Sequence, residues 1–447
     1  MPELLDLAER IAADARPGEE VEAYVAWQRD TDIRAYNGEV ESLSAAESAG
    51  IGVRVIVGGR QGFAYVGDLD EADAREALAE ARDNATFATV DDHAGLAHPD
   101  GVAPAELELW AEGAATWPTT DKVALALALE RAARAGDPRV RQVVSADYGD
   151  GCAETAIASS TGIRATSRRT TCYVAADVVA GGGEETQTGV GYHVGRDPAD
   201  LRVDEAARDA VERATRLLGA TKPHSATLTV VLDPRVTATL LAILAGALSG
   251  EEVAKGRSMF AGRLGQQVGA AQLTLVDDPT DPRALGAARY DAEGLACRPT
   301  VLVDGGRLSG FLYDTYSARL AGATSTGSAV RAGFKSGPGV GARALALAPG
   351  ELDQDGVLAA AGDGLLVQSI TGVHSGVSAV SGDFSVGAEG LRIRGGALAE
   401  PVREVTIAST LQRMLQSLLA VGNDVEWLPG NAAGQSVAIA EVAMSGA

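Results

Sequence analysis

An uncharged and mostly apolar stretch runs from Val236 to Leu248, and a polar, glycine-punctuated turn that ends at Gly256 follows it. Apolar residues lie on every side of a helix drawn through this stretch, so the pattern predicts a buried helix with no face left for water. A membrane-spanning helix needs about 20 apolar residues, which is more than the stretch provides. We therefore expect a core helix in the largest domain of the chain.

The apolar pattern of residues 1–90 predicts a first unit in which helices pack on antiparallel strands. Apolar residues at helical spacing indicate an amphipathic helix at the amino terminus. Asn37-Gly38 is typical of a two-residue hairpin turn, and Asp70 predicts the start of a helix over residues 70–85. The residues that indicate half-buried strands by alternation are Val21, Ala23, Val25, Trp27, Ile51, Val53, Val55 and Val57, followed by Phe63 and Tyr65.

A second unit of the same rough plan is predicted over residues 115–220. The segment between the two units mixes proline, histidine and acidic residues, which is typical of a domain boundary. Thr161-Gly162 indicates a hairpin turn inside the second unit. The pattern predicts helices over residues 119–135 and 204–218, strands over residues 140–148, 154–160, 163–169 and 171–180, and a further strand through Val190.

Residues 223–447 are predicted to form a larger domain around the core helix. Pro223 fixes the chain at the start of this domain. The expected fold class is α+β, with two smaller helix-on-antiparallel-sheet units followed by this larger β-rich carboxy-terminal domain. Its predicted elements are strands over residues 228–232 and 273–276, hairpins over 299–313 and 391–400, a long loop rich in Gly, Ser and Thr over 321–341, and a last helix over 411–421.

The charge balance narrows the classes of function. The 447 residues include 38 Lys and Arg against 61 Asp and Glu, which gives a net charge of -23 and a pI near 4.6. Such a chain repels phosphate backbones and anionic lipid, so we expect neither nucleic acid nor a membrane as a partner. The three cysteines form no CxxC motif, and the amino terminus is acidic where a signal peptide is basic. We expect a cytoplasmic protein with reduced, buried thiols.

The segment from Thr371 to Gly390 is the strongest candidate for a site on residue chemistry alone. It surrounds His374 and Asp383 with glycines and hydroxyl groups, which suits close backbone approach to a ligand. One interpretation is a self-sufficient hydrolase that uses His374 and Asp383, and another is a glycine-rich connection between strands. His93 and His98 lie among aspartates, which is compatible with a divalent-ion site or with a solvated acidic loop.

Other motifs of enzyme chemistry are absent from the sequence. It contains no GxSxG nucleophile elbow and no Walker A loop. Residues 337–342 imitate a dinucleotide-binding loop, but Pro338 and the loop before it argue against the strand that such a site requires. Residue chemistry alone therefore predicts an acidic, multidomain α+β protein without a visible active site.

Five segments of the chain occur together and in a fixed order. They are LSGEEVAKGRSMFAGRLGQQV (Leu248 to Val268), ATSTGSAVRAGFKSGPGVGA (Ala323 to Ala342), LAPG (Leu347 to Gly350), TGVHSGVSAVSGDFSVGAEG (Thr371 to Gly390) and PVREVTIASTLQRML (Pro401 to Leu415). This set resembles the TldD/TldE (PmbA) family. The resemblance is strong over residues 223–430 and weaker but collinear over the two preceding units, and its details favour the TldE, or PmbA, branch.

The resemblance implies a division of labour between two chains. TldD and TldE pair as a cytosolic metallopeptidase that trims unfolded or leader-bearing peptides, and TldD holds the zinc. The TldD ligands include an HExxxH motif on the core helix, whose positions fall here on Leu241, Ala242 and Gly246, and a cysteine whose position falls near Gly430 or Asn431. The expected ligands are absent, so the resemblance implies no cofactor in this chain and zinc in a TldD-type partner. Alkyl groups on a buried helix also avoid the cost of unpaired polar groups.

The prediction that follows is a TldE-type subunit without zinc and without catalytic residues of its own. We expect it to form a heterodimer with a TldD-type chain and to bind unfolded peptides by strand addition. A homodimer is an alternative where the partner is missing. The alternatives are the self-sufficient hydrolase and a non-enzymatic regulatory protein that binds peptides or proteins. The residues expected to contact peptide or partner are Gly372, His374, Ser375, Gly376, Ser381, Gly382, Asp383 and Phe384.

Overall fold

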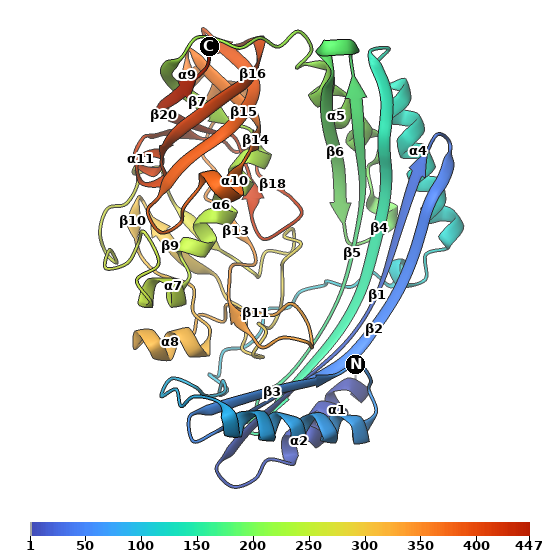
Figure 1. The fold of residues 1–447 in the computed structure, drawn as a ribbon, viewed down its shortest axis with the longest axis vertical. Helices are drawn as coiled ribbons and strands as arrows, with labels where there is room; N and C mark the ends of the chain where they lie inside the picture. The colour runs from blue at the N-terminus through green and yellow to red at the C-terminus, as the bar shows by residue number, and fades with distance from the viewer. Residues whose placement is uncertain (1) are drawn as a thin grey trace.

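The computed structural model describes residues 2–447, so Met1 of the predicted first unit lies outside the described residues. The amino-terminal half is built on one six-stranded antiparallel sheet in the order β3-β2-β1-β4-β5-β6. Figure 1 shows a long curved sheet with α1 and α2 at one end and the carboxy-terminal domain on one side. The elements are α1 (Pro2–Ala13), β1 (Glu19–Tyr36), β2 (Glu39–Val57), β3 (Arg60–Val66), α2 (Glu71–Phe87), α3 (Glu112–Ala115), α4 (Thr119–Ala135), β4 (Val140–Ser159), β5 (Arg164–Ala180), η1 (Gly183–Glu185), β6 (Gln187–Gly195), η2 (Pro198–Asp200) and α5 (Val203–Thr215).

The strands of the two predicted units are continuous with each other. β1 of the first unit pairs with β4 of the second, in a register that runs from Glu22 opposite Ser159 to Ala35 opposite Ala146. The α+β fold class is confirmed, with helices packed on this sheet and a β-rich carboxy-terminal domain. The division into residues 1–90, 115–220 and 223–447 stays a prediction.

Two strands are longer than the sequence predicted. β4 is a single strand where two were expected, and so is β5. The expected gap in β4 contains Gly149, but a side chain at this position would overlap the ring of Tyr173 on β5. Gly149 therefore makes room for an aromatic ring on the neighbouring strand and does not end its own strand.

Helices α2 and α4 of this half begin within one residue of their predicted starts. The Asp70 carboxylate accepts a hydrogen bond from the Ala72 N–H at 2.7 Å, which fixes the start of α2. α4 begins at Thr119 and ends at Ala135, as predicted. Mainly small residues face the sheet from these helices, among them Ala77 and Ala81 of α2, which lets helix and sheet approach closely.

The carboxy-terminal domain is built on a second sheet in the order β16-β15-β14-β7-β20-β17. β16 also pairs with β20, so five of these strands close into a ring. The elements are β7 (Ala226–Leu232), α6 (Pro234–Ala247), α7 (Gly250–Ala254), β8 (Leu275–Asp277), β9 (Thr300–Asp304), β10 (Arg307–Leu308), α8 (Thr315–Ala321), β11 (Ala329–Val330), β12 (Gly339–Val340), β13 (Leu345–Leu347), α9 (Gln354–Ala361), β14 (Gly364–Thr371), α10 (Val373–Gly376), β15 (Asp383–Arg394), β16 (Ala397–Thr410), α11 (Leu411–Gln416), β17 (Leu418–Val421), β18 (Glu426–Trp427), β19 (Ala433–Gly434) and β20 (Val437–Ser445).

Two elements of this domain correct the sequence-based expectation. The last helix ends at Gln416, because Leu418 to Val421 pair with β20 and form strand β17. The glycine-rich stretch over residues 321–341 is not wholly irregular, since its β11 and β12 segments pair with each other. Long-range pairing decides both cases, and local propensity cannot report it.

The core helix α6 is buried on one side only. Asp233 caps its first turn by accepting a hydrogen bond from the Arg235 N–H, and Leu241 and Leu244 are among the most deeply buried side chains of the chain. The prediction that no side of this helix faces water is wrong, because Ala242 and Gly246 are exposed. α6 packs against β7, β14 and β19 on its buried side, which leaves a stripe of small residues open.

The start of α6 also joins the two halves of the molecule. The Arg235 guanidinium donates to the Val190 carbonyl on β6 and lies 3.9 Å from the centre of the Tyr192 ring. Arg213 on α5 pairs with Asp233 at 3.0 Å. These contacts fix the position of α6 relative to the sheet.

Three cysteines are buried and unpaired, namely Cys152, Cys172 and Cys297. Burial raises the pKa of Cys172 and of Cys297 to about 12, so neither thiol is an activated nucleophile. Within residues 2–447, no helix combines the length and the apolar character needed to cross a bilayer.

Candidate functional site

The family resemblance places two metal-binding histidines at Leu241 and Gly246 of α6 and a glutamate that polarises a bound water at Ala242, and none of these three residues has a donor atom in its side chain. Leu241 is 2% exposed and packs in the domain core, whereas Ala242 and Gly246 are exposed. A methyl group added to Gly246 would meet no atom within 4 Å, so this side of α6 borders open space. An unpaired polar side chain would therefore be costly at Leu241 and not at the two exposed positions. These residues do not fit the zinc that a metallopeptidase site requires.

The described part of the chain offers no other ligand set for a metal. Within residues 2–447, no group of three or more His, Cys, Asp and Glu side chains is close enough to hold an ion. In the loop singled out from the sequence, Asp100 pairs with Arg298 at 2.7 Å and the Asp91 carboxylate accepts the His93 N–H at 2.9 Å. Near the position expected for a cysteine, Asn431 donates to a backbone carbonyl at 3.4 Å.

The predicted peptide-contact residues lie in the turn that joins β14 to β15 and in the first two residues of β15. The Gly372 carbonyl accepts hydrogen bonds from the Gly376 N–H at 2.8 Å and from the Ser375 hydroxyl at 3.3 Å, which closes α10. The Ser381 hydroxyl donates to the Asp383 carboxylate at 2.7 Å. The glycines and hydroxyl groups of this segment thus serve first to hold the turn together.

The turn is anchored on the domain core at its far end. The Gly382 carbonyl accepts the Leu411 N–H at 2.7 Å, and Phe384 is 3% exposed and belongs to the core cluster. His374 is exposed on α10, and within residues 2–447 no hydrogen bond joins it to Asp383. The structure therefore gathers the predicted contact residues but does not assemble the histidine–aspartate pair of the hydrolase interpretation.

A cavity of about 700 Å³ lies between the sheet and the carboxy-terminal domain. Its walls come from the middle of β1, β4 and β5, from residues 107–110 and 287–292, and from the β11–β12 connection over residues 331–336 together with Arg343. A cavity of this size suits a small ligand or part of a peptide. No local sequence pattern indicates this cavity, because its walls are far apart along the chain and only the fold brings them together.

Positive charge is concentrated in this cavity. Its acidic side chains are Glu108 and Asp291, and the Asp291 carboxylate already accepts backbone N–H groups, among them that of Leu295 at 3.0 Å. The cationic side chains that line it are Arg168, Arg169, Arg289, Arg331, Lys335 and Arg343. The adjacent arginines 168 and 169 on one predicted strand were the only trace of this cluster in the sequence.

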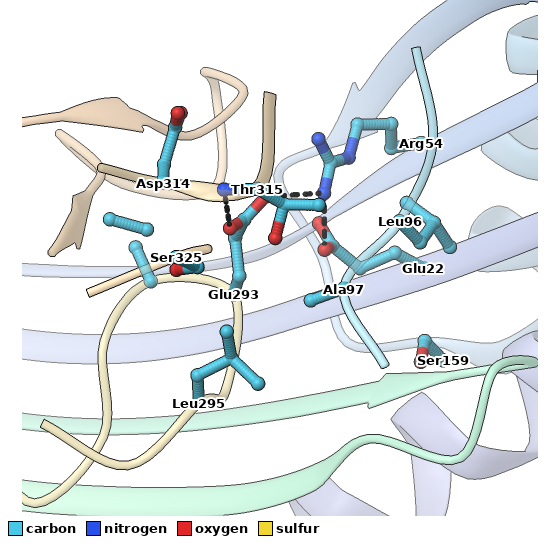
Figure 2. Close-up of polar contacts among 12 residues, drawn as sticks. Glu22, Arg54, Leu96, Ala97, Ser159, Glu293, Leu295, Asp314, Thr315 and Ser325 are labelled. Atoms are coloured by element: carbon cyan, nitrogen blue, oxygen red, sulfur yellow. Dashed lines mark hydrogen bonds and ion pairs between the residues drawn. The ribbon is translucent and has the colours of Figure 1, made fainter. Parts of the chain in front are cut away.

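A cluster of buried charges next to the cavity joins the sheet to the carboxy-terminal domain (Figure 2). Glu22 on β1 pairs with Arg54 on β2 at 2.7 Å and with Arg331 at 2.6 Å. Arg54 also lies 3.6 Å from Glu293, which accepts the Thr315 N–H at 2.9 Å. Each of the four charged side chains is at most 5% exposed. The cluster therefore depends on mutual pairing and not on solvent.

The carboxyl groups of this cluster differ in their electrostatics. Burial favours a higher pKa for Glu22, but the charges of Arg54 and Arg331 outweigh it and lower the pKa to about 2. Burial raises the pKa of Glu293 to about 7 despite the charge of Arg54, and the neighbouring Asp291 adds to the rise. Burial and the charges of the neighbouring Asp291 and Asp314 together outweigh the charge of Arg54, so Glu293 retains its proton more readily than an exposed glutamate.

Known proteins resemble this chain over nearly its whole length. Models of the PmbA/TldA metallopeptidase family match in chain order: domain 1 over residues 21–85, the central domain over residues 113–218 and the C-terminal domain over residues 225–446. Metalloprotease PmbA of Escherichia coli O157:H7 is 27% identical over 426 residues, which cover 95% of this chain and 92% of that protein.

Solved structures agree with the fold. A proposed modulator of a DNA gyrase from Thermotoga maritima superposes with a TM-score of 0.90 at 24% identity, over 98% of this chain and 99% of its own. TldE from Thermococcus kodakarensis gives a TM-score of 0.89 at 22% identity, over 100% of both chains. The protein is thus a member of a peptidase family. More closely, the chain belongs to the PmbA/TldD metallopeptidase family.

Proposed function

We propose that this chain is the TldE-type subunit of a two-chain metallopeptidase and that a TldD-type chain supplies the zinc and the catalytic residues. The observation that carries the proposal is the composition of α6. Leu241, Ala242 and Gly246 stand where the zinc-binding relative is expected to have its two helix ligands and the glutamate between them, and none can coordinate a metal or activate water through its side chain. The open side of α6 then serves as a wall of a shared cavity and not as a metal centre.

The proposed substrates are unfolded or leader-bearing peptides in the cytoplasm. The turn from Gly372 to Phe384 is the proposed contact with peptide or partner, since its exposed residues His374, Ser375 and Asp383 are available for hydrogen bonds. An extended peptide needs backbone groups as partners, and turns with short side chains leave such groups accessible. These residues position a peptide in the proposal and take no part in bond cleavage.

The experiment that tests this function is co-purification with a TldD-type chain, followed by peptide cleavage. The proposal predicts a complex of the two chains in equal amounts by native mass spectrometry, cleavage of an unstructured peptide by the complex, and none by this chain alone. Cleavage by this chain alone, after removal of contaminating proteases by a second purification step, would contradict the proposal. So would a failure of the two chains to associate at micromolar concentration.

A further inference from the structure

The cavity between the sheet and the carboxy-terminal domain has a charge opposite to that of the whole protein. The chain carries 61 acidic against 38 basic residues, yet six basic side chains and two acidic ones line this cavity. A chain with a net charge of -23 has many carboxylates to pair with its arginines. The cavity wall nevertheless carries more cations than carboxylates. A negatively charged ligand would therefore be attracted to this surface.

Most of these cations lack an ion-pair partner within residues 2–447. Arg331 pairs with Glu22, and Arg168 lies 3.2 Å from the exposed Glu112. The other four cations, for which the described residues form no ion pair, are Arg169, Arg289, Lys335 and Arg343. Arg289 and Arg343 are half-buried and donate to backbone carbonyls, whereas Arg169 and Lys335 are exposed to solvent. The four side chains therefore keep a positive charge at this surface that no ion pair with a described residue neutralises.

In the part of the chain that the structure describes, several buried N–H groups at this surface have no hydrogen-bond acceptor, just as several of its cations have no ion-pair partner. The Arg331 side chain is 1% exposed, and its Nε and Nη1 atoms have no hydrogen-bond partner among the described residues. The same holds for Arg343 Nε and for the indole N–H of Trp110. Buried donors without partners are rare in proteins, and a ligand with acceptor oxygens would satisfy them.

Arg169 is the centre of this electrostatic strain. Its side chain keeps contact with solvent inside the walled cavity, yet burial lowers its pKa and the charge of Arg343 lowers it further. The charge of Asp30 offsets part of this lowering, but within residues 2–447 no hydrogen bond from Arg169 to a carboxylate contributes to its pKa. A residue in this situation contributes little to folding, and an anion beside it would relieve the repulsion between the two guanidinium groups.

Aromatic rings lie beside the charges. The Arg331 guanidinium is 4.5 Å from the centre of the Tyr24 ring, and that of Arg168 is 5.3 Å from the centre of the Trp110 ring. Trp27 also lines the cavity. Arginines beside aromatic rings bind ligands that combine an anionic group with apolar surface, whereas inorganic phosphate offers the anionic group alone.

We propose that this cavity binds a peptide segment through its carboxylates, which rests on the proposed function in that the ligand is a peptide. Arginine forks bind carboxylates in two parallel hydrogen bonds, and the aromatic walls cover the apolar parts of the segment. The carboxylate belongs either to an acidic side chain or to the carboxy terminus of the peptide. Recognition here selects acidic substrates or holds the end of the chain, apart from the place of cleavage.

The test measures the binding of peptides to the isolated full chain. Binding is monitored by calorimetry and by tryptophan fluorescence, because Trp27 and Trp110 line the cavity. Three alanine-rich hexapeptides are compared: one blocked at both ends with two glutamates, the same peptide with glutamines, and a neutral peptide with a free carboxy terminus. Inorganic phosphate is the fourth probe. The variant is Arg169→Gln, and the matched control is Arg131→Gln, an exposed position on α4.

The proposal predicts binding of at least one carboxylate-bearing peptide and no binding of the blocked glutamine peptide. Binding of the glutamate peptide identifies the side-chain carboxylate, and binding of the neutral free acid identifies the carboxy terminus. Arg169→Gln weakens binding about tenfold, the effect of losing one charge-assisted hydrogen bond, without lowering the melting temperature. Arg131→Gln leaves the affinity unchanged, and added salt weakens binding to the parent chain.

Binding of the blocked glutamine peptide as tight as that of the carboxylate-bearing peptides, no binding of either carboxylate-bearing peptide, or no effect of Arg169→Gln would overturn the proposal. Binding of phosphate without binding of any carboxylate peptide would overturn it too. The measurement needs neither zinc nor a partner chain. Its failure therefore leaves the proposed pairing with a TldD-type chain untouched, and a failure of that pairing leaves the binding result standing.

Discussion

Arg331 of the carboxy-terminal domain and Glu22 of the first β-strand approach within 2.6 Å, and their side chains are 1% and 2% exposed. The two residues stand far apart in the chain, so this ion pair fixes the position of the β11–β12 connection on the sheet. Arg54 completes the cluster from β2 at 2.7 Å from Glu22. The same Arg331 side chain lines the cavity, which couples the shape of the cavity to the contact between domains.

Glu22→Gln tests how much this ion-pair cluster contributes to the free energy of unfolding. The substitution leaves two guanidinium groups without their buried carboxylate, and removal of one partner from a buried pair costs roughly 3–5 kcal/mol. We expect the urea midpoint of unfolding to fall accordingly. Glu39→Gln, at an exposed position on β2, is the matched control and should leave the midpoint unchanged. Equal midpoints for the two variants would show that the cluster does not hold the domains together.

The buried Glu293 predicts an unusual dependence of stability on pH. Its pKa rises from 4.5 to about 7 on folding, so the native state binds a proton that the unfolded chain releases. The free energy of unfolding therefore falls by roughly 1–3 kcal/mol in total as the pH rises through this interval. Above the interval it levels off. Glu22 stays ionised throughout this interval, because its pKa is about 2.

The check is urea unfolding between pH 5 and pH 8 in the parent chain and in Glu293→Gln. The glutamine can still accept the Thr315 N–H and carries no charge, so this variant should lose the pH dependence above about pH 6 and be the more stable chain at pH 8. At lower pH, the fall in stability with rising pH should persist in both chains, because burial also raises the pKa of Asp277 and of Asp291 to about 6. Identical pH profiles for the two chains would mean that Glu293 is ionised in the native state.

Close packing between Gly50 and Phe334 predicts a steric effect at the same contact. A methyl group at Gly50 would overlap the Phe334 ring, which is 7% exposed, and the Val66 carbonyl. Overpacking of this kind costs typically about 1–3 kcal/mol, so Gly50→Ala should lower the melting temperature by several degrees. Gly67→Ala, where a methyl group meets nothing within 4 Å, is the control. Equal melting temperatures would contradict the packing described here.

Much of the local structure follows from the sequence, since Asp70 caps α2 and Thr119 begins α4 as predicted. The misses share one physical cause, which is contact between distant parts of the chain. Leu418 to Val421 have a helical pattern but pair with β20, and Gly149 continues a strand because Tyr173 needs the space. The open side of α6 and the cationic cavity are likewise products of packing, which no local pattern reports.

His374→Ala separates the proposed subunit role from the hydrolase interpretation. His374 is exposed and has no hydrogen bond to Asp383 within residues 2–447, so it is not organised as a base. In the complex with a TldD-type chain, we expect kcat to stay within about twofold and any effect to appear in KM or in assembly. His98→Ala is the control for an exposed histidine. A fall in kcat on the order of 100-fold would favour acid–base catalysis by His374.

The most direct measurement of the central claim is the zinc content of each species. Two samples are compared: the isolated chain and the purified complex, both with the natural residues at positions 241, 242 and 246. Each is dialysed against buffer that contains trace zinc, and its zinc content is measured by atomic emission. We expect no zinc on this chain alone, and one zinc per complex together with peptidase activity. Stoichiometric zinc on the isolated chain would contradict it.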